Sequence, residues 1–447
     1  MPMTREDNEL LTRVGPGTPM GQLFRQYPIP VLQSSELAPG GPPRRVRLLG
    51  EDLIAFRTRR GAVSIMGEGC QHKYASLYYG RIEDDGMRCV YHGWKYGFDG
   101  RCLDMPNVPP EFQFKDRIRH PAYPCVEKAG VVWTYMGGGS ECPALPELEF
   151  LLVPDAQRAY RVDYQNCNYM QAMEGGIDPA HGAFLHGPLH SMSLADTSAL
   201  EPHGTELAGD RKIGRTFTIA FATGQRTPRV ETVETDYGMM TAGRRDASAD
   251  EYLYRINHFL MPFYTMPPAD GIESYLAHMW VPVDDEHHVN WLVMWNPNRA
   301  LNAEERDSHK SSHMPPTPEA FGNIRLAAQR SNDYFMDWEI HATRRFGIPT
   351  IHLEDVAVTE SQGPIVDRTK EHLTQADEPV VAARRRLMNA ARALRERGEV
   401  PVGARAPEMY REIRGASLTL PKTSAWGKAM QEQRAAGSKR DQRGSRA

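Results

Sequence analysis

The chain has 447 residues, of which 40% are hydrophobic and 25% are charged, and its formal net charge is −4. This composition is that of an ordinary globular protein with room for two or three domains, and the charge gives no reason to expect nucleic acid as a partner. No stretch approaches the roughly 18–20 apolar residues that span a bilayer, and Met1–Asp7 is too polar for a signal peptide. We therefore expect a cytoplasmic protein with no membrane partner.

The region from Val46 to Tyr135 contains short β-rich runs separated by Gly and Asp turns, among them Leu53–Arg57 and Gly130–Tyr135. Two loops between these runs carry the pattern C-x-H, sixteen residues, C-x-x-H. Its four members are Cys70, His72, Cys89 and His92. Two thiolates and two imidazoles at this spacing can bind a [2Fe-2S] cluster, with both cysteines on one iron and both histidines on the other, which is a Rieske centre.

A structural zinc site is the alternative for the same four residues, since Cys and His are also zinc ligands. Zinc motifs usually pair Cys with Cys and His with His, whereas each loop here carries one of each. The run after His92, Gly93-Trp94-Lys95-Tyr96-Gly97, adds glycines that allow tight turns and aromatics that exclude water from one side. The pattern therefore favours the cluster.

Neutral histidines in place of two thiolates raise the potential of such a cluster, so it can accept electrons from a ferredoxin or flavin reductase. The chain has neither G-x-G-x-x-G nor G-K-[ST], and so no visible nucleotide site of its own. We expect the electrons to come from a separate reductase. The remaining cysteines are expected to be free thiols: Cys102, Cys125, Cys142 and Cys167.

Beyond about residue 155 the sequence alternates between strand-like and helix-like segments. We predict helices at Tyr169–His181, Phe321–Arg345 and Val380–Gly398, and strands at His278–Val283 and Val289–Trp295. The polar stretch Leu301–Ala320 is predicted to be a long loop. The basic segment 427–447 is predicted to be a flexible tail.

A second candidate metal site lies at the end of the first predicted helix. His181 and His186 are five residues apart, a spacing that lets a helix end and the next turn converge on one metal. Two histidines and one carboxylate form the facial triad of non-heme iron oxygenases. Asp178, three residues before His181, is better placed to contact a histidine than to bind beside it, so the carboxylate must come from elsewhere.

With these motifs together, the chain resembles the oxygenase (alpha) component of Rieske non-heme iron ring-hydroxylating oxygenases, in particular the phthalate dioxygenase branch. The resemblance rests on both metal motifs, on Glu174–Asp178 and on the late block Glu354–Leu373. It implies an α+β chain: an all-β Rieske domain at 41–145 and a helix-grip-like catalytic domain, an antiparallel sheet with helices, at 146–426. Residues 1–40 would be an N-terminal segment packed on the catalytic domain.

The resemblance also implies site roles. The third ligand of the mononuclear Fe(II) would be Asp355, with Glu354 and Asp337 as competitors. The enzymes of this family form rings of three subunits, some stacked as hexamers, in which the cluster of one subunit lies against the iron of the next. Asp178 would then be a catalytic bridge from His181 to His72 or His92 of the neighbour.

The implied reaction is dihydroxylation of an aromatic ring with O₂, and the branch suggests an aromatic carboxylate as substrate. A carboxylate calls for an Arg or Lys in an apolar pocket, for which Arg215, Arg244 and Arg245 are candidates. The alternatives are a Rieske monooxygenase that hydroxylates or O-demethylates an aromatic acid, a pure electron carrier, and a zinc-stabilised binding protein without redox activity.

Overall fold

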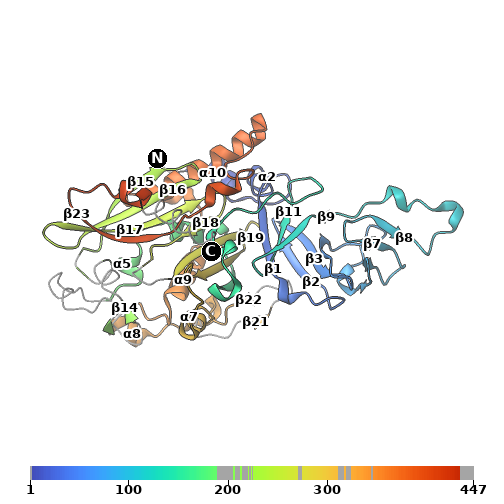
Figure 1. The fold of residues 1–447 in the computed structure, drawn as a ribbon, viewed down its shortest axis with the longest axis horizontal. Helices are drawn as coiled ribbons and strands as arrows, with labels where there is room; N and C mark the ends of the chain where they lie inside the picture. Colours follow the sequence, from blue (N-terminus) through green and yellow to red (C-terminus); the bar gives the residue numbers. More distant parts are fainter. Residues whose placement is uncertain are drawn as a thin grey trace, which may run out of the picture.

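The computed structural model describes residues 3–188, 205–206, 212–213, 220, 223, 225–269, 274–310, 317–318, 324–343 and 346–432. Figure 1 shows an elongated molecule, with small β-sheets toward one end and a long sheet with its helices toward the other. No helix among the described residues is long and apolar enough to cross a membrane. The candidate Arg215 and the tail from residue 433 lie outside the described residues.

Three small antiparallel sheets form the N-terminal part. Their strand orders are β2-β3-β4-β9, β5-β6-β7-β8 and β1-β11-β10. A separate apolar core that includes Phe56, Met87, Trp94 and Tyr96 fills the cluster end of this part. The strands are β1 (Pro28–Gln33), β2 (Arg44–Leu48), β3 (Glu51–Arg57), β4 (Val63–Gly67), β5 (Arg81–Ile82), β6 (Gly86–Arg88), β7 (Lys95–Gly97), β8 (Cys102–Asp104), β9 (Ala122–Tyr123), β10 (Cys125–Lys128) and β11 (Val131–Tyr135).

The N-terminal segment is divided between the two parts of the molecule. Helices α1 (Arg5–Thr12) and α2 (Pro19–Phe24) pack on the catalytic part, where the Tyr169 hydroxyl donates to the Leu11 carbonyl at 2.7 Å. Strand β1, however, pairs with β11 along its length. Residues 28–33 thus share a sheet with β10 and β11, while Ile29, Val31 and Leu32 also lie in the main apolar core together with residues of the catalytic part.

The catalytic part is built on one long sheet of order β15-β16-β17-β18-β19-β20-β12-β22-β21, to which β23 adds by pairing with β17. All pairs are antiparallel except β12 with β22. The strands are β12 (Arg158–Gln165), β15 (Arg229–Glu234), β16 (Gly238–Asp246), β17 (Glu251–Leu260), β18 (Tyr264–Met266), β19 (Tyr275–Pro282), β20 (His288–Trp295), β21 (Thr317–Pro318), β22 (Ile324–Arg325) and β23 (Ala416–Pro421), with a separate pair β13 (Thr205–Glu206) and β14 (Lys212–Ile213).

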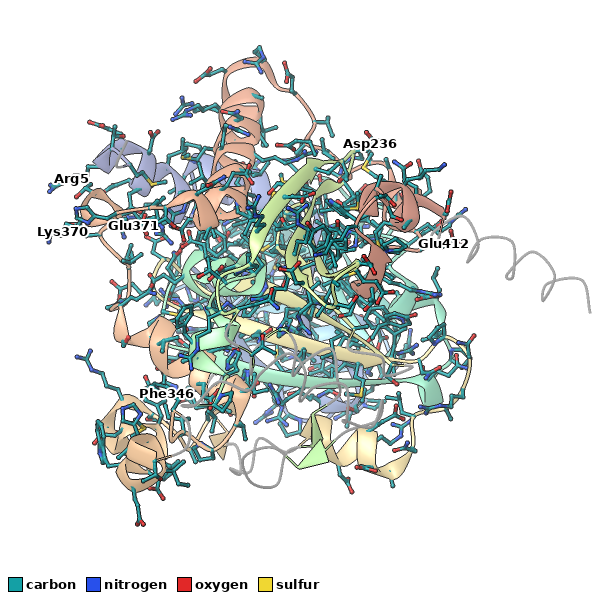
Figure 2. All side chains as sticks on the ribbon, turned by 90° about the vertical axis from the view of Figure 1, so that its left-hand side faces the viewer. Arg5, Asp236, Phe346, Lys370, Glu371 and Glu412 are labelled. Atoms are coloured by element: carbon teal, nitrogen blue, oxygen red, sulfur yellow. The ribbon has the colours of Figure 1, made fainter. Side chains whose placement is uncertain are left out.

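Helices surround this sheet, and Figure 2 looks onto this end of the molecule, with the loop of Lys370 and Glu371 on one side and Glu412 on the other. The α-helices are α3 (Glu149–Leu152), α4 (Tyr169–Ile177), α5 (Gly182–Leu185), α7 (Ala303–Lys310), α8 (Trp338–Thr343), α9 (Ile351–Ser361) and α10 (Glu378–Arg397). Short 3₁₀ turns are η1 (Ser34–Glu36), η2 (Leu77–Tyr79), η3 (Pro110–Phe112), η4 (Lys115–Arg117), η5 (Asp155–Gln157), η8 (Arg330–Phe335), η9 (Arg368–Lys370), η10 (Gln375–Asp377) and η11 (Pro407–Tyr410).

Several predicted elements are confirmed. Helix α10 matches the prediction at 380–398 and ends where Gly398 adopts a φ of +66°. Strands β19 and β20 match their predictions, and helix α4 covers the first part of the helix predicted at 169–181 but ends at Ile177.

Three predictions are wrong. The helix predicted at 321–345 is replaced by β22, η8 and α8, because Asp333, Tyr334 and Phe335 have φ values of 50°, 53° and 58°, a left-handed turn that cannot continue an α-helix. The predicted loop 301–320 contains α7. Residues 427–432, predicted to be flexible, are helical, and Met430 is buried because the segment packs on the main core with Trp426.

Candidate metal centres

The four cluster candidates lie in two loops, one after β4 and one after β6. Cys70 and Cys89 are buried, and the rings of His72 and His92 lie 4.4 Å apart between centroids. The second loop is a tight turn in which the Gly93 N–H donates to the Cys89 carbonyl at 3.0 Å. Gly93 has a φ of +77°, and a Cβ there would lie 2.6 Å from Pro106 Cγ, so glycine is required.

The residues present fit an iron–sulfur cluster. Nδ1 of His72 is buried and has no hydrogen-bond partner, which is costly for a polar atom unless a metal binds it. Desolvation, together with His92 and Lys73, lowers the pKa of His72, which favours the neutral, ligating form. Burial raises the pKa of the Cys89 thiol, and the nearby Cys70 thiol adds to this effect.

Aromatic side chains enclose the cluster candidates on one side, as the sequence predicted. Trp94 stacks on His72 with 4.8 Å between ring centroids, and its Nε1–H donates to Asn107 Oδ1 at 2.7 Å. The Tyr96 hydroxyl lies 3.2 Å from Cys70 Sγ and also accepts the Gln71 N–H. The sequence indicated Tyr96 only as one of the aromatics that exclude water, and it gave no sign of the contact between the Tyr96 hydroxyl and Cys70 Sγ.

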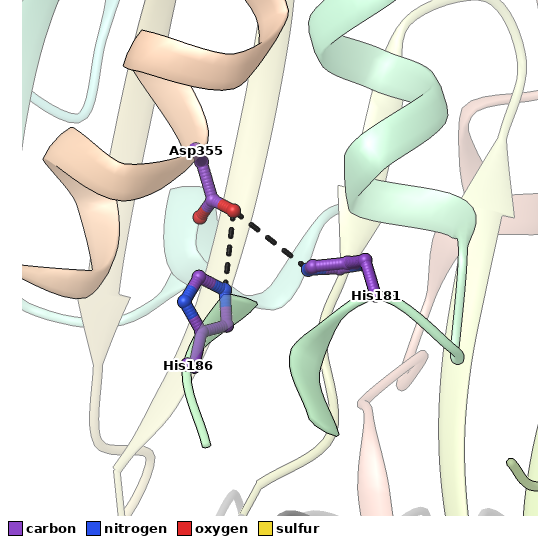
Figure 3. Close-up of side chains that lie close together, drawn as sticks. All are labelled: His181, His186 and Asp355. Atoms are coloured by element: carbon purple, nitrogen blue, oxygen red, sulfur yellow. Dashed lines mark ion pairs between the residues drawn. The ribbon is translucent and has the colours of Figure 1, made fainter. Parts of the chain in front are cut away.

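The second site brings His181, His186 and Asp355 together (Figure 3). One ligand atom of each residue lies within 4.8 Å of the others. Asp355 Oδ1 is 3.1 Å from His186 Nε2 and 3.7 Å from His181 Nε2. The histidines flank α5, and Asp355 comes from α9, 169 residues further along the chain.

The other nitrogen of each histidine is already occupied. His181 Nδ1 lies 3.0 Å from the Asp178 carbonyl, and His186 Nδ1 lies 2.7 Å from Glu354 Oε2. A neutral histidine with Nδ1–H donating in this way presents Nε2 as a metal-binding lone pair. Both Nε2 atoms consequently face the carboxylate of Asp355.

Electrostatics at this site favour a cation. Burial lowers the pKa of His186, but Asp355 and Glu354 outweigh it and raise the pKa to about 9. Burial raises the pKa of Asp355, but His186 and His181 outweigh it and lower the pKa. The two carboxylates therefore create a negative environment around the imidazoles, which a divalent metal would neutralise.

The competing carboxylates occupy other positions. Glu354 is buried against Nδ1 of His186, away from the nitrogen that Asp355 faces. Asp337 is exposed, and its Oδ1 accepts the N–H groups of Glu339 and Ile340 at the start of α8. From the sequence we expected Glu354 only as a competing ligand. Its contact with Nδ1 of His186 was not predicted, because no sequence pattern indicates it.

Asp178 ends α4, and its side chain accepts the N–H groups of Ala180 at 2.7 Å and His181 at 3.1 Å. Burial raises the pKa of Asp178, but the hydrogen bonds from His181 and from the backbone outweigh it and lower the pKa. The residue is thus an ionised contact of His181, placed as the sequence expected of a partner rather than a ligand.

The two arginine candidates that the structure describes differ in position. Arg244 is paired with Glu231 at 3.0 Å and lies over the ring of Tyr252. Arg245 is buried, and burial lowers its pKa to about 9, opposed by the charge of Asp178. Arg245 is therefore the one that lies within electrostatic reach of the second site.

Comparison with known proteins agrees with both sites. The Rieske [2Fe-2S] domain model matches residues 27–124, and the LigXa C-terminal domain like model matches 134–444. The 3-chlorobenzoate-3,4-dioxygenase oxygenase subunit of Comamonas testosteroni is 38% identical over 96% of this chain and 98% of its own. The phthalate 4,5-dioxygenase oxygenase subunit of Pseudomonas putida is 33% identical over 90% of this chain and 89% of its own.

Solved structures show the same fold at lower identity. Pseudomonas putida CBB5 NdmA with caffeine has a TM-score of 0.55 at 18% identity, covering 91% of this chain and 100% of that chain. The oxygenase in a complex with the ferredoxin of carbazole 1,9a-dioxygenase has a TM-score of 0.52 at 19% identity, covering 86% of this chain and 94% of that chain. These matches confirm an all-β Rieske domain followed by a catalytic domain of antiparallel sheet and helices.

The family match favours the cluster over zinc and accounts for the second site, which a pure electron carrier would not need. The cofactors of the protein are a [2Fe-2S] cluster and a mononuclear iron. The protein is an enzyme, and the chain belongs to the Rieske non-heme iron oxygenases as an oxygenase (alpha) subunit.

Proposed function

We propose that the enzyme dihydroxylates the ring of an aromatic carboxylate with O₂ and with electrons from a separate reductase of the flavin or ferredoxin type. The observation that carries the proposal is the convergence of His181, His186 and Asp355, whose ligand atoms all lie within 4.8 Å of one another. Two relatives above 30% identity are named for a chlorobenzoate and for phthalate, both aromatic acids.

The proximity of the side chains supports the proposed assignment of ligands. His181, His186 and Asp355 would hold the iron, and Cys70, His72, Cys89 and His92 would hold the cluster. When bound, the iron supplies dioxygen activation and the cluster supplies single electrons. The chain itself fixes the tautomers of both iron histidines through Asp178 and Glu354, so that each presents Nε2.

An aromatic carboxylate needs a cation beside it, and the proposed cation is Arg245, a buried residue whose charge interacts with that of Asp178. Its guanidinium donates to the Gln225 carbonyl at 3.1 Å, which holds it in place within the sheet. Burial destabilises the charged form of Arg245 and lowers its pKa, so a substrate carboxylate close to the guanidinium would stabilise that charge.

Electron transfer is proposed to cross between subunits. In one chain, β7 of the cluster module and α5 of the iron site lie toward opposite ends of the long axis (Figure 1). A ring of three subunits, or a stacked hexamer, would place the cluster of one chain beside the iron of the next. Asp178, which contacts His181, is the proposed bridge to His72 or His92 of the neighbour.

A second candidate reaction is monooxygenation, since a 5,5'-dehydrodivanillate O-demethylase subunit from Sphingobium is 28% identical over 89% of this chain. Isotope-labelled dioxygen separates the two reactions. The purified oxygenase, with a surrogate reductase and NADH, is given 3-chlorobenzoate or phthalate, and the product mass is measured. We expect two labelled oxygen atoms in the product. One labelled atom in the product, or release of formaldehyde from a methoxybenzoate, would support the monooxygenase instead.

A further inference from the structure

Helix α9 carries both Glu354 and Asp355, and buried polar contacts hold it at each end. Toward its C-terminus, Glu360 accepts the Asn166 N–H at 2.8 Å and the Tyr334 hydroxyl at 2.6 Å. In its first turn, His352 Nε2 lies 2.9 Å from Asp163 Oδ2, off the direction of an ideal hydrogen bond. The contact in the first turn is therefore a close polar approach without the geometry of a hydrogen bond.

Asp163 belongs to the rigid sheet. It lies on β12, opposite Asn290 of β20, and it is 2% exposed. Its Oδ2 also accepts the Arg161 Nε–H at 2.8 Å. Burial raises the pKa of Asp163, but His352 and Arg161 outweigh it and lower the pKa to about 2. The carboxylate is thus charged at neutral pH and fixed by the sheet on which it lies.

The rotation of α9 about its own axis matters for the iron site. Successive residues of an α-helix are about 100° apart, so Glu354 and Asp355 point in different directions and reach different nitrogens of His186. Leu353, Val356 and Ala357 pack the helix on a small apolar core, and apolar contacts are non-directional. His352, three residues before Asp355, lies on the same side of the helix, and its contact with Asp163 fixes one point on that side against the sheet.

We propose that Asp163 is a positioning residue which, through His352, sets the rotation of the first turn of α9 and so aims Asp355 at His181 and His186. The proposal rests on the assignment of Asp355 as a metal ligand. Asp163 itself is not one of the proposed metal ligands, and its side chain contacts Arg161 and His352.

The test is metal affinity, measured on the full-length protein with its cluster retained and its mononuclear iron removed by a chelator. Co²⁺ is titrated by calorimetry into wild type, Asp163→Asn and His352→Gln. We expect the Kd for Co²⁺ to rise about tenfold in each variant, the lower end of the range for residues behind metal ligands. The Kd of the double variant for Co²⁺ should not exceed that of the single variant with the higher Kd, since both substitutions remove the same contact.

A matched control separates positioning from loss of stability. Glu149 is also a buried carboxylate, which accepts the Trp295 Nε1–H at 2.8 Å and pairs with Arg414, and neither partner belongs to α4, α5 or α9. Glu149→Gln should lower the Tm about as much as Asp163→Asn yet leave the Kd for Co²⁺ unchanged. Hydrogen exchange of the metal-free protein should accelerate at amides 353–356 in Asp163→Asn and not in Glu149→Gln.

The outcomes decide the proposal. Equal Kd values for Asp163→Asn and Glu149→Gln at equal Tm would overturn it, since stability alone would then explain any effect. If Asp163→Asn does not fold, His352→Gln decides, and an unchanged Kd there overturns the proposal. Asp355→Ala serves as a reference: Co²⁺ binding as tight as in wild type would show that Asp355 is not a ligand, which overturns the ligand assignment and with it the positioning role.

Discussion

The two metal centres are prepared by the polypeptide in different ways. At the cluster site, His72 Nδ1 is left without a partner, and the ring is held by stacking on Trp94. At the iron site, Nδ1 of both His181 and His186 is already occupied by an oxygen atom, from Asp178 and Glu354. The cluster site thus depends on its cofactor to satisfy its donors, whereas the iron site is oriented by the protein before metal binds.

The largest effect is expected for Asp355→Ala, which should abolish binding of the mononuclear metal and leave the cluster unchanged. Asp355→Ala removes the carboxylate that faces both Nε2 atoms, so the mononuclear metal should be lost and activity should fall by at least about 1,000-fold. The visible spectrum of the cluster should not change. Iron analysis and absorption spectra check this, and a variant that keeps its full iron content would contradict the ligand assignment.

Asp178→Asn should leave both metals bound but reduce turnover by at least about 100-fold, because the charged contact of His181 that is proposed to face the neighbouring cluster is lost. The measurement is single-turnover oxidation of the reduced cluster, with iron content as control. Wild-type turnover with intact metals would end the bridging role.

Glu354→Gln tests whether the iron site is pre-oriented. The amide can no longer hold His186 as the carboxylate does, and metal affinity should fall about 10- to 100-fold while the cluster remains. Asp337→Asn is the matched control, since this exposed carboxylate only caps α8. If both variants bind Co²⁺ alike, Glu354 does not orient the histidine.

The smallest effect is expected at the cluster. Tyr96→Phe removes the hydroxyl 3.2 Å from Cys70 Sγ, and a hydrogen bond worth about 1 kcal/mol that stabilises the reduced, more negative cluster corresponds to about 40 mV. The potential should therefore fall by tens of millivolts, measured by redox titration. An unchanged or higher potential would show that the Tyr96 hydroxyl does not donate to the sulfur.

The sequence was most informative where ligands are close together along the chain. Cys70 to His92 span two loops of one small module, and their spacing predicted the first group. His181 and His186 flank one short helix, and their spacing predicted a metal site only in combination with the Rieske motif earlier in the chain. Asp355 lies 169 residues from His186, and only a family resemblance could select it from Glu354 and Asp337. The contact of Asp163 with His352 joins a strand and a helix by tertiary packing, for which no local pattern exists.

Errors in the predicted fold have a related cause. The helix predicted at 321–345 fails at Asp333–Phe335, where three consecutive residues adopt left-handed backbone angles although none of them is a glycine. Composition favours a helix there, and tertiary context imposes the turn. Conversely, Met430 and Trp426 pack on the core of the catalytic part, which a polar, basic segment does not suggest.

The placement of α5 and β7 toward opposite ends of the chain has a genetic consequence. If each iron receives its electrons from the cluster of the neighbouring subunit, a mutation at the cluster stops electron supply to the neighbour, whereas a mutation at the iron stops the reaction in its own subunit. Two variants that are each inactive, one lacking its cluster and one lacking its iron, would then complement one another when co-assembled, as defective alleles do within a mixed oligomer.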